Sequence, residues 1–290
     1  MLLLPACRQH KEAFEKAPLA PGQVEVVRLS ERTNLAVERV RFWSNEMNEP
    51  RFFLALVPKT LPKTQVAPSE VFILNHGWWD RPEDLLQSLK VDQVYDEMLG
   101  RGEVRPAIMV LPDVRFSSFY RQYSDRFPYP NYLTLVAEEV AGTVSRRYAI
   151  PFERRRWAIG GFSFGGYLSL DVGRRYPGRF ASVSVVSGLV DKQWSFWPSQ
   201  PPPPGPLDSK GRGKQTIVVP GPIPRLFLAC GSNDRLFATM RDLHQELTDL
   251  GIPHVWSSGP GGHTWKYWSS VLPLMLRFHL AREQSQVEAK

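Results

Sequence analysis

Cysteine is almost absent from this chain, whose 290 residues contain only Cys7 and Cys230. Two cysteines supply neither the disulfide framework of a small secreted domain nor a multi-cysteine zinc site. Long hydrophobic runs are absent as well, since no apolar stretch approaches the roughly 18 residues that a transmembrane helix requires. The sequence therefore predicts no metal site and no transmembrane span. Cys230 lies in an apolar strand-like run and is expected to be an inert core thiol.

A concentrated basic run is also missing, although the chain carries a net charge of +7 and has a pI near 9.5. The arginines are dispersed, and no nucleic-acid-binding motif frames them. Two short clusters, at 146–147 and 154–156, are interpreted as solvated faces. We expect no nucleic-acid partner.

Apolar runs of strand length alternate with helical patterns along the chain, which is 42% hydrophobic and 22% charged. This composition and length predict one α/β domain over residues 23–281, with an N-terminal extension at 1–22 and a tail at 282–290. We expect a mostly parallel central sheet with helices on both faces and an antiparallel N-terminal edge, because only short polar turns separate the first strands. The expected strands are 24–30, 36–43, 52–57, 71–75, 107–111, 157–160, 182–186 and 226–230.

One helix and one break in the pattern stand out between these strands. Apolar residues repeat at helical spacing from Leu133 to Val144, so we expect a helix with Asn131 as its N-cap that ends before Pro151. Residues 197–224 are rich in proline, which excludes a long helix or a central strand there. We expect this segment to be either a lid over the active site or a disordered loop.

The segment at 161–165 reads G-x-S-x-G, with Ser163 at its centre. An apolar run precedes it and a helical pattern follows it, which is the context of a nucleophile elbow. At such an elbow a sharp turn presents the serine hydroxyl to a base, and Gly161 and Gly165 let the strand and the helix approach. The pentapeptide alone arises by chance in roughly one chain of this length in ten, so an acid and a histidine must follow it.

Four histidines follow Ser163, and one differs from the others. His263 lies in a glycine-rich loop after a short strand-like run at 253–256 and before an apolar helix, a position that suits a general base. His244 lies on a helix of 3.6-residue period, and we interpret it, together with His254 and His279, as belonging to solvated faces. A loop histidine that caps the next helix is the alternative for His263.

Asp234 is the best candidate for the acid that orients this histidine. It follows an apolar strand and a Gly-Ser-Asn turn, so it falls at the carboxyl end of the strand and beside the start of a helix. An N-cap role for that helix is the alternative. Asp191, after the strand that follows the nucleophile, and Asp208, in the proline-rich loop, are the competing acids.

An oxyanion hole needs two hydrogen-bond donors. The first is expected to be the amide of Phe164, directly after the nucleophile. The run at 71–74 opens into Asn-His-Gly-Trp-Trp-Asp at 75–80, which resembles an H-G-G-type oxyanion loop with the amide of Trp78 as second donor. His76 is interpreted as a structural loop histidine without a role in proton transfer.

Taken together, these blocks resemble the α/β-hydrolase superfamily, in the esterase branch that contains esterase D, feruloyl esterases, enterochelin esterases and the antigen 85 mycolyltransferases. The resemblance spans roughly residues 24–281 and includes the motifs at 75–77, 110–113, 161–165, 231–234 and 261–265. It implies the α/β-hydrolase fold, with Ser163 as nucleophile, His263 as general base and Asp234 as the orienting acid. The bulky pair at 78–79 departs from many relatives, which carry smaller residues there.

Aromatic residues make up 12% of the chain, and several fall near the expected site loops. Trp79, Trp194 and Trp265 are candidate substrate-binding residues, because flat rings suit sugar or aryl groups. Arg115, in the loop after Pro112 and Asp113, is a further candidate because it can approach the substrate from that loop. Core packing is the alternative for the tryptophans and the favoured interpretation of Trp268. The expected partner is a small-molecule ester, and no cofactor is needed.

The leading hypothesis is a serine esterase that forms an acyl-enzyme, which water hydrolyses. An acyltransferase with the same triad and a non-catalytic binding protein on the same fold are the alternatives. The first seven residues resemble the end of a bacterial lipoprotein signal but lack a basic n-region and a full apolar h-region. As written, the chain is expected to be cytoplasmic; with a start further upstream, it would be an exported lipoprotein anchored at Cys7.

Overall fold

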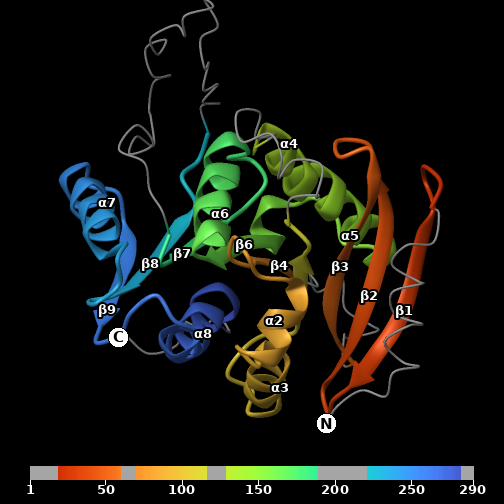
Figure 1. The fold of residues 1–290 in the computed structure, drawn as a ribbon, viewed down its shortest axis with the longest axis horizontal. Coiled ribbons are helices and arrows are strands. Elements are labelled where there is room, and N and C mark those ends of the chain that lie inside the picture. Colours follow the sequence, from red (N-terminus) through yellow and green to blue (C-terminus); the bar gives the residue numbers. More distant parts are fainter. Residues whose placement is uncertain (1–18, 60–69, 116–128, 189–220, 282–290) are drawn as a thin grey trace, which may run out of the picture.

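The computed structural model describes residues 19–59, 70–115, 129–188 and 221–281. Their strands form one sheet in the order β1-β2-β3-β5-β4-β6-β7-β8-β9 (Figure 1). The strands are β1 Val24–Glu31, β2 Leu35–Ser44, β3 Glu49–Pro58, β4 Glu70–Asn75, β5 Ala107–Pro112, β6 Trp157–Phe162, β7 Ser182–Val186, β8 Arg225–Gly231 and β9 His254–Gly259.

Across the sheet, the pairing of neighbouring strands changes once from antiparallel to parallel. The pairs β1–β2, β2–β3 and β3–β5 are antiparallel. Every pair from β5–β4 across to β8–β9 is parallel. The predicted mostly parallel sheet with an antiparallel N-terminal edge is therefore confirmed, and the expected strands are all present, with ends that differ by a few residues at most.

Helices cover both faces of this sheet, as expected. Figure 1 shows α4, α5 and α6 on one side and α2, α3 and α8 on the other. The helices are α2 Pro82–Gln87, α3 Val91–Gly100, α4 Tyr129–Thr134, α5 Ala141–Tyr148, α6 Phe164–Arg175, α7 Phe237–Asp249 and α8 Trp265–Leu280, with a π-helical turn at Leu135–Val140 and a 3-10 turn at Arg154–Arg156.

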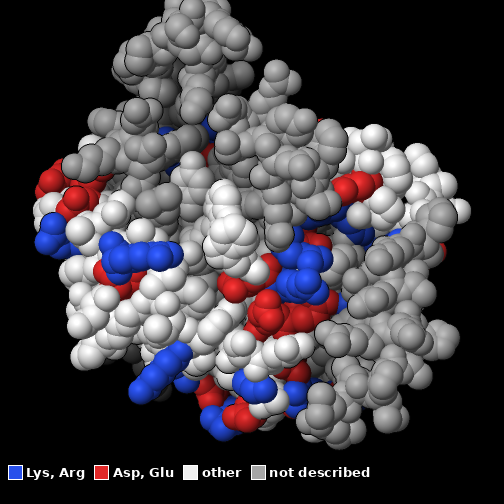
Figure 2. Space-filling view, viewed as in Figure 1, with Lys and Arg blue, Asp and Glu red and all other residues white. Residues whose placement is uncertain are grey.

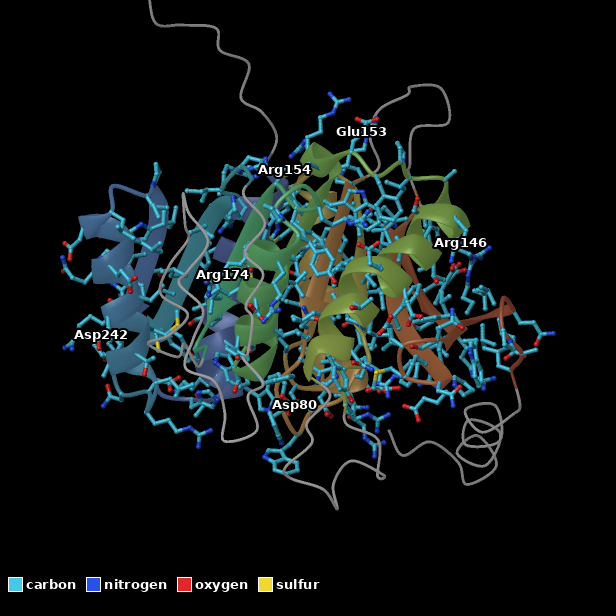
Figure 3. All side chains as sticks on the ribbon, turned by 90° about the horizontal axis from the view of Figure 1, so that it is seen from above. Asp80, Arg146, Glu153, Arg154, Arg174 and Asp242 are labelled. Carbon is cyan, nitrogen blue, oxygen red and sulfur yellow. The ribbon has the colours of Figure 1, made fainter. Side chains whose placement is uncertain are left out.

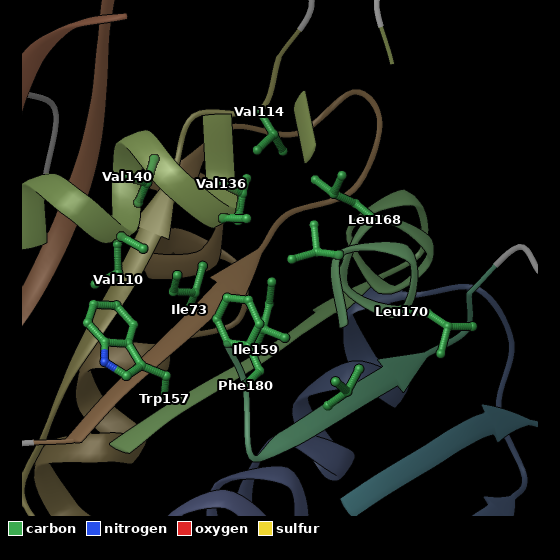
Figure 4. Close-up of a cluster of buried hydrophobic side chains, with 14 of the residues drawn as sticks. Ile73, Val110, Val114, Val136, Val140, Trp157, Ile159, Leu168, Leu170 and Phe180 are labelled. Atoms are coloured by element: carbon green, nitrogen blue, oxygen red, sulfur yellow. The ribbon is translucent and has the colours of Figure 1, made fainter. Parts of the chain in front are cut away.

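Two apolar cores follow from this arrangement, one on each face of the sheet. In the first, Ile73 and Ile159 of neighbouring strands pack beneath Val136 and Leu168 of the covering helices (Figure 4). All six residues of β4 are buried, because a strand covered on both faces has no solvent side. Burying each such side chain stabilises the fold by about 1.5–3 kcal/mol before the cost of ordering it.

The helical segment around residue 131 begins earlier than predicted. Asn131 lies inside α4, so it is not the N-cap; its side-chain amide instead donates to the carbonyl oxygen of Glu46 at 2.9 Å. The other end agrees with the prediction, since α5 stops at Tyr148, before Pro151. Ala149 terminates the helix in the left-handed conformation, with φ of +53°.

The charged surface is mixed in sign. On the face in Figure 2, basic and acidic residues are interspersed rather than gathered into one basic patch. The interpretation of residues 154–156 as a solvated face is wrong for Arg156, whose side chain is buried and bound to Glu153 at 3.1 Å. Arg155 beside it is exposed and pairs with the same carboxylate.

His279 is not on a solvated face, contrary to the sequence interpretation. It lies in the last turn of α8 and is buried, with its ring against Phe72 at 4.4 Å between centroids. Its Nδ1 is 2.8 Å from Ser182 Oγ, and its Nε2 has no hydrogen-bond partner among the residues that the structure describes. Burial, with a smaller contribution from the charge of Arg225, lowers the pKa of His279 well below its usual value of 6.5.

This buried histidine predicts acid sensitivity of the fold. Below about pH 6.5 the unfolded chain binds a proton that the folded chain excludes, so the free energy of unfolding falls as the pH falls, by about 1.4 kcal/mol per pH unit. In His279→Phe, which keeps the ring packing, that contribution should disappear. Urea unfolding of both proteins between neutral pH and pH 5 measures the two slopes, and equal slopes would contradict the prediction.

Several expectations fall outside the described residues. They include Cys7, Asp191, Trp194 and Asp208, together with the proline-rich segment except for its last four residues. Within the described ranges, no helix is both long and apolar enough to cross a membrane.

Candidate active site

Three polar side chains from distant parts of the chain meet at the carboxyl edge of the parallel strands. Ser163 stands between β6 and α6, Asp234 follows β8, and His263 follows β9. Because β6 to β9 run parallel, the loops that leave them emerge at the same edge of the sheet. The structure thus brings together the three residues that the motif spacing singled out.

Their side chains form a continuous hydrogen-bonded chain. His263 Nε2 lies 2.9 Å from Ser163 Oγ, and His263 Nδ1 lies 3.0 Å from each carboxylate oxygen of Asp234. The Asp234 side chain is fully buried, whereas that of His263 is 17% exposed. In this arrangement a histidine can accept a hydroxyl proton while a shielded carboxylate fixes its tautomer and stabilises its cation.

The backbone at Ser163 is strained. Its φ of +54° and ψ of −121° lie outside the regions that residues with a Cβ normally adopt. Gly161 and Gly165 make this turn feasible: a Cβ on Gly165 would lie 2.2 Å from the carbonyl oxygen of Asn75, and one on Gly161 would lie 2.4 Å from the Gly165 backbone. The first turn of α6 therefore sits directly against the end of β4, with no side chain between them.

The imidazole of His263 packs against the indole of Trp268, which a hydrogen bond holds in place. Trp268 meets it edge-on, with ring centroids 5.0 Å apart. The indole Nε1 of Trp268 donates to the Oγ of buried Ser187, which follows β7. Trp268 is buried in the second core, as predicted, and it also limits the positions that the His263 ring can take.

Asp234 is not the N-cap of α7, since Leu236 has that position, but its side chain is tied to the start of the helix. One of its carboxylate oxygens, Oδ1, accepts the backbone N–H of Leu236 at 2.9 Å, just before α7 begins. Both oxygens also face His263. The bond that ties the carboxylate to the start of α7 therefore helps to hold it in place for the histidine.

The turn at residues 77–80 faces the nucleophile and is tied at both ends. The backbone N–H of Gly77 donates to Asp80 Oδ2 at 3.1 Å, and the N–H of Asp80 returns to the carbonyl oxygen of Gly77 at 3.3 Å. His76, fully buried, places Nδ1 2.7 Å from the same carbonyl oxygen and accepts the N–H of Val114 at Nε2. Since Nε2 is the acceptor, Nδ1 carries the proton and donates it.

This double anchorage orients the next amide. The carbonyl of Gly77 and the N–H of Trp78 belong to one trans peptide and point in opposite directions. Two donors hold the carbonyl oxygen, so the Trp78 N–H is fixed on the other side. The indole of Trp78 packs edge-on against Phe164, with centroids 4.9 Å apart, which places this turn beside the N-terminus of α6.

Arg115 lies near this turn but is bound to a carboxylate. Its Nε and a terminal nitrogen contact the two oxygens of Asp113 at 2.8 and 2.9 Å. Burial alone would raise the pKa of Asp113, but His76, Arg115 and Arg51 outweigh it and hold that pKa below its usual range. A substrate contact by Arg115 stays a prediction.

The remaining candidate residues occupy varied positions. Trp79 is 78% exposed and Trp78 40%, while Trp265 is partly buried against Trp268. Substrate contacts by Trp79 and Trp265 stay predictions, and Trp194 lies outside the described residues. Cys230 is buried, and burial first of all raises the pKa of its thiol to about 12, as expected of an inert core thiol.

Two of the histidines interpreted as solvated form a pair at the surface. His244 and His254 are partly buried, with Nδ1 of the first 2.7 Å from Nε2 of the second. The ring of His244 also stacks on Trp256. Both lie on the α7 and β9 side of the sheet and have no recorded contact with Ser163.

One residue of the site was missed by the sequence analysis. Asp80 was quoted only as the end of a motif, yet its carboxylate shapes the turn that faces Ser163. An acid three residues after His-Gly is the signal that could have identified it, because an Asp side chain commonly accepts a backbone N–H within such a turn.

Comparison with known proteins adds a family and a fold. A family model described as "Putative esterase" matches residues 44–279. Over 264 residues, covering 82% of this chain and 96% of the relative, the chain is 22% identical to an acetyl esterase of Caldicellulosiruptor saccharolyticus.

Solved structures agree with the fold. A ferulic acid esterase superposes with a TM-score of 0.66 at 20% identity, over 89% of this chain and 98% of the other. The fluorophosphonate-binding serine hydrolase F of Staphylococcus aureus gives a TM-score of 0.64 at 17% identity, over 86% of this chain and all of the other. Both likenesses support the α/β-hydrolase fold that the sequence motifs implied.

Proposed function

Because this chain belongs to the "Putative esterase" family and is a carboxylic-ester hydrolase, we propose that Ser163, His263 and Asp234 form its catalytic triad and that it acts through an acyl-enzyme. The observation that carries the proposal is the hydrogen-bonded chain from Ser163 Oγ through His263 to the buried Asp234. A buried carboxylate on one ring nitrogen and a hydroxyl on the other is the arrangement that activates a serine.

In the proposed reaction Ser163 Oγ attacks the ester carbonyl while its proton passes to His263 Nε2. The C–O bond of the leaving alcohol then breaks, and His263 returns the proton to the alcohol oxygen. Water, deprotonated by the same nitrogen, attacks the acyl carbon. The bond between that carbon and Ser163 Oγ then breaks, His263 returns the proton to Oγ, and the acid is released. Asp234 stays ionised throughout and stabilises the imidazolium at Nδ1.

The amides of Phe164 and Trp78 are proposed to bind the oxyanion. Phe164 is the first residue of α6, so its N–H lies at the positive end of the helix. The Trp78 N–H belongs to the peptide whose carbonyl is held by His76 and Asp80. Fixed donors such as these stabilise the developing charge without having to reorient during the reaction.

The substrate is proposed to be a small ester with an aryl or sugar group. Exposed Trp78 packs against Phe164, the residue after the nucleophile, and exposed Trp79 packs against Trp78, so both offer flat apolar surfaces near the site. Support comes from the likeness to a ferulic acid esterase solved in complex with ferulic acid and to a feruloyl esterase module solved with sinapinate.

Labelling with a fluorophosphonate, followed by mass spectrometry, tests the proposal directly. The expected result is one adduct per chain, on Ser163. An excess of an ester substrate, added before the reagent, should slow or prevent this labelling. A burst of nitrophenol from p-nitrophenyl acetate should precede steady-state turnover if acylation is faster than deacylation. An adduct on another residue, or none, would overturn the triad assignment.

Product analysis of the turnover reaction separates hydrolysis from acyl transfer. The acyl-enzyme can be intercepted by an alcohol instead of water, so turnover is repeated with glycerol or glucose added. Free acid as the main product supports the esterase. Acylated glycerol or sugar as the main product would assign the chain to acyl transfer with the same triad.

A further inference from the structure

Asp80 places a second carboxylate at the active site, besides that of Asp234. A methyl group added to Gly77 would lie 2.5 Å from Asp80 Oδ2 and 3.6 Å from Ser163 Cβ, so only the bare Gly77 separates the Asp80 carboxylate from the nucleophile. Unlike Asp234, Asp80 is only half-buried and can meet a bound ester.

The two oxygens of this carboxylate differ in their surroundings. Oδ2 accepts the N–H of Gly77, which fixes the side chain on the turn. For Oδ1 the described part of the chain supplies no hydrogen-bond donor, and no described arginine or lysine forms an ion pair with Asp80. Oδ2 thus holds the side chain in position, and Oδ1 is left to interact with a ligand.

The electrostatic environment of Asp80 offers little compensation. Burial is the largest influence on the pKa of Asp80 and raises it; the charge of Asp84 raises it as well, and the hydrogen bond from the Gly77 N–H lowers it by less. In its ionised form, this carboxylate is a half-buried negative group beside the reacting centre. It repels an anionic substituent there and attracts a cationic one.

We propose that Asp80 is a specificity-determining residue that rejects esters with an anionic group near the scissile bond and favours esters with a cationic one. This inference rests on the proposed function, since it concerns the same nucleophile. It opposes the expectation from the whole molecule, whose net charge of +7 attracts anions at long range. We expect the charge of Asp80 to outweigh the net charge of the molecule, because an adjacent, poorly solvated charge is screened far less than distant surface charges.

Matched charged esters test this selectivity. The first pair consists of the acetate esters of meta-hydroxyphenyltrimethylammonium and meta-hydroxybenzenesulfonate, with phenyl acetate as the neutral reference. The second pair carries the charge in the acyl half, as phenyl esters of trimethylammonioacetic and sulfoacetic acids. All these charges are permanent, and the assays are run above neutral pH so that Asp80 is ionised.

The measured quantity is the ratio of kcat/KM for the cationic ester to that for the anionic ester. In Asp80→Asn, which keeps an acceptor for the Gly77 N–H, this ratio should fall about tenfold in at least one pair, mostly through faster cleavage of the anionic ester. The pair with the larger change identifies the half of the substrate that lies beside Asp80. Intrinsic differences in leaving group cancel between wild type and variant.

Asp242→Asn is the matched control, because it removes the same charge from an exposed site on α7. Figure 3 shows Asp242 at the left edge of the molecule, away from Asp80 near the middle of the lower edge. Its ratios should equal those of wild type, which excludes a general charge effect. Asp80→Ser, with a shorter acceptor, serves as a second variant if Asp80→Asn folds poorly, and fluorophosphonate labelling checks that each variant retains its nucleophile.

The outcomes separate this inference from the proposed function. Unchanged ratios in both pairs, in a variant that still cleaves phenyl acetate and still labels at Ser163, would overturn the role of Asp80 and leave the triad intact. A wild type that cleaves none of the esters and does not label would instead overturn the proposed function itself.

Discussion

Ser163→Ala should lower kcat for ester hydrolysis by about 10⁴ to 10⁶-fold and abolish fluorophosphonate labelling. The physical reason is the loss of the only hydroxyl within 2.9 Å of His263 Nε2 among the described residues, and with it the acyl-enzyme route. Any remaining rate would come from the oxyanion donors and from substrate binding alone. Steady-state kinetics with p-nitrophenyl acetate measures the loss.

The control for this experiment is another serine in a described helix. Ser270 is exposed on α8, and its hydroxyl donates to the carbonyl oxygen of Tyr267. Ser270→Ala should retain full activity and labelling. If Ser163→Ala kept more than about one hundredth of the wild-type kcat with an unchanged fold, a nucleophilic role for Ser163 could not stand, since triad serines contribute far more than that.

Asp234→Asn is expected to have the second largest effect, a decrease in kcat of about 10³ to 10⁴-fold. An asparagine amide can donate to His263 Nδ1, which leaves the proton on Nε2 and removes the acceptor that Ser163 needs. It also removes the negative charge that stabilises the imidazolium. KM should change much less than kcat, because Asp234 is fully buried and does not reach the substrate.

The fold should survive this substitution, since Asn can still accept the N–H of Leu236. Circular dichroism and thermal unfolding check that point. Asp249→Asn, at the exposed end of α7, is the matched control and should leave kcat unchanged. A small effect of Asp234→Asn would reopen the question of the acid, for which Asp191 and Asp208 were the alternatives.

The strands were predictable because a sheet covered on both faces requires continuous apolar runs. β5 and β6 are such runs of six residues, β4 has four apolar residues between Glu70 and Asn75, and all residues of the three strands are buried. The positions of the proposed triad residues followed from the same topology: loops after parallel strands emerge at one edge, so residues 163, 234 and 263 are expected to meet there. Local pattern and global fold pointed to the same place.

The histidine on α8 was misassigned although its signal was present. His279 continues the buried stripe of Trp268, Leu272, Met275 and Leu276 at helical spacing, and this stripe faces the sheet. The polar side chain of His279 favours a position at the surface, whereas its helical spacing from the buried residues places it in the core. Spacing prevailed because α8 packs against both the sheet and α3.

The start of α4 shows a different limit. Asn131 has a strong cap preference, but Pro130 is well tolerated in the first turn of a helix, and α4 begins at Tyr129. The role of Asp80 could not be read from any periodic pattern, although its place three residues after His-Gly was a local signal. It depends on a four-residue turn closed by two bonds, one from the Gly77 N–H to the Asp80 carboxylate and one from the Asp80 N–H to the Gly77 carbonyl oxygen, and such a turn has no periodic signature.

The contact of α6 with β4 through Gly161 and Gly165 has a practical consequence for assays. Because no side chain lies between α6 and β4, the two backbones are in direct contact. Ser163 and the turn after β4 therefore cannot separate unless this backbone packing opens. A molecule that titrates with an active-site reagent is therefore a molecule with an intact sheet. The burst amplitude can serve as a direct count of native protein during purification, storage or heating.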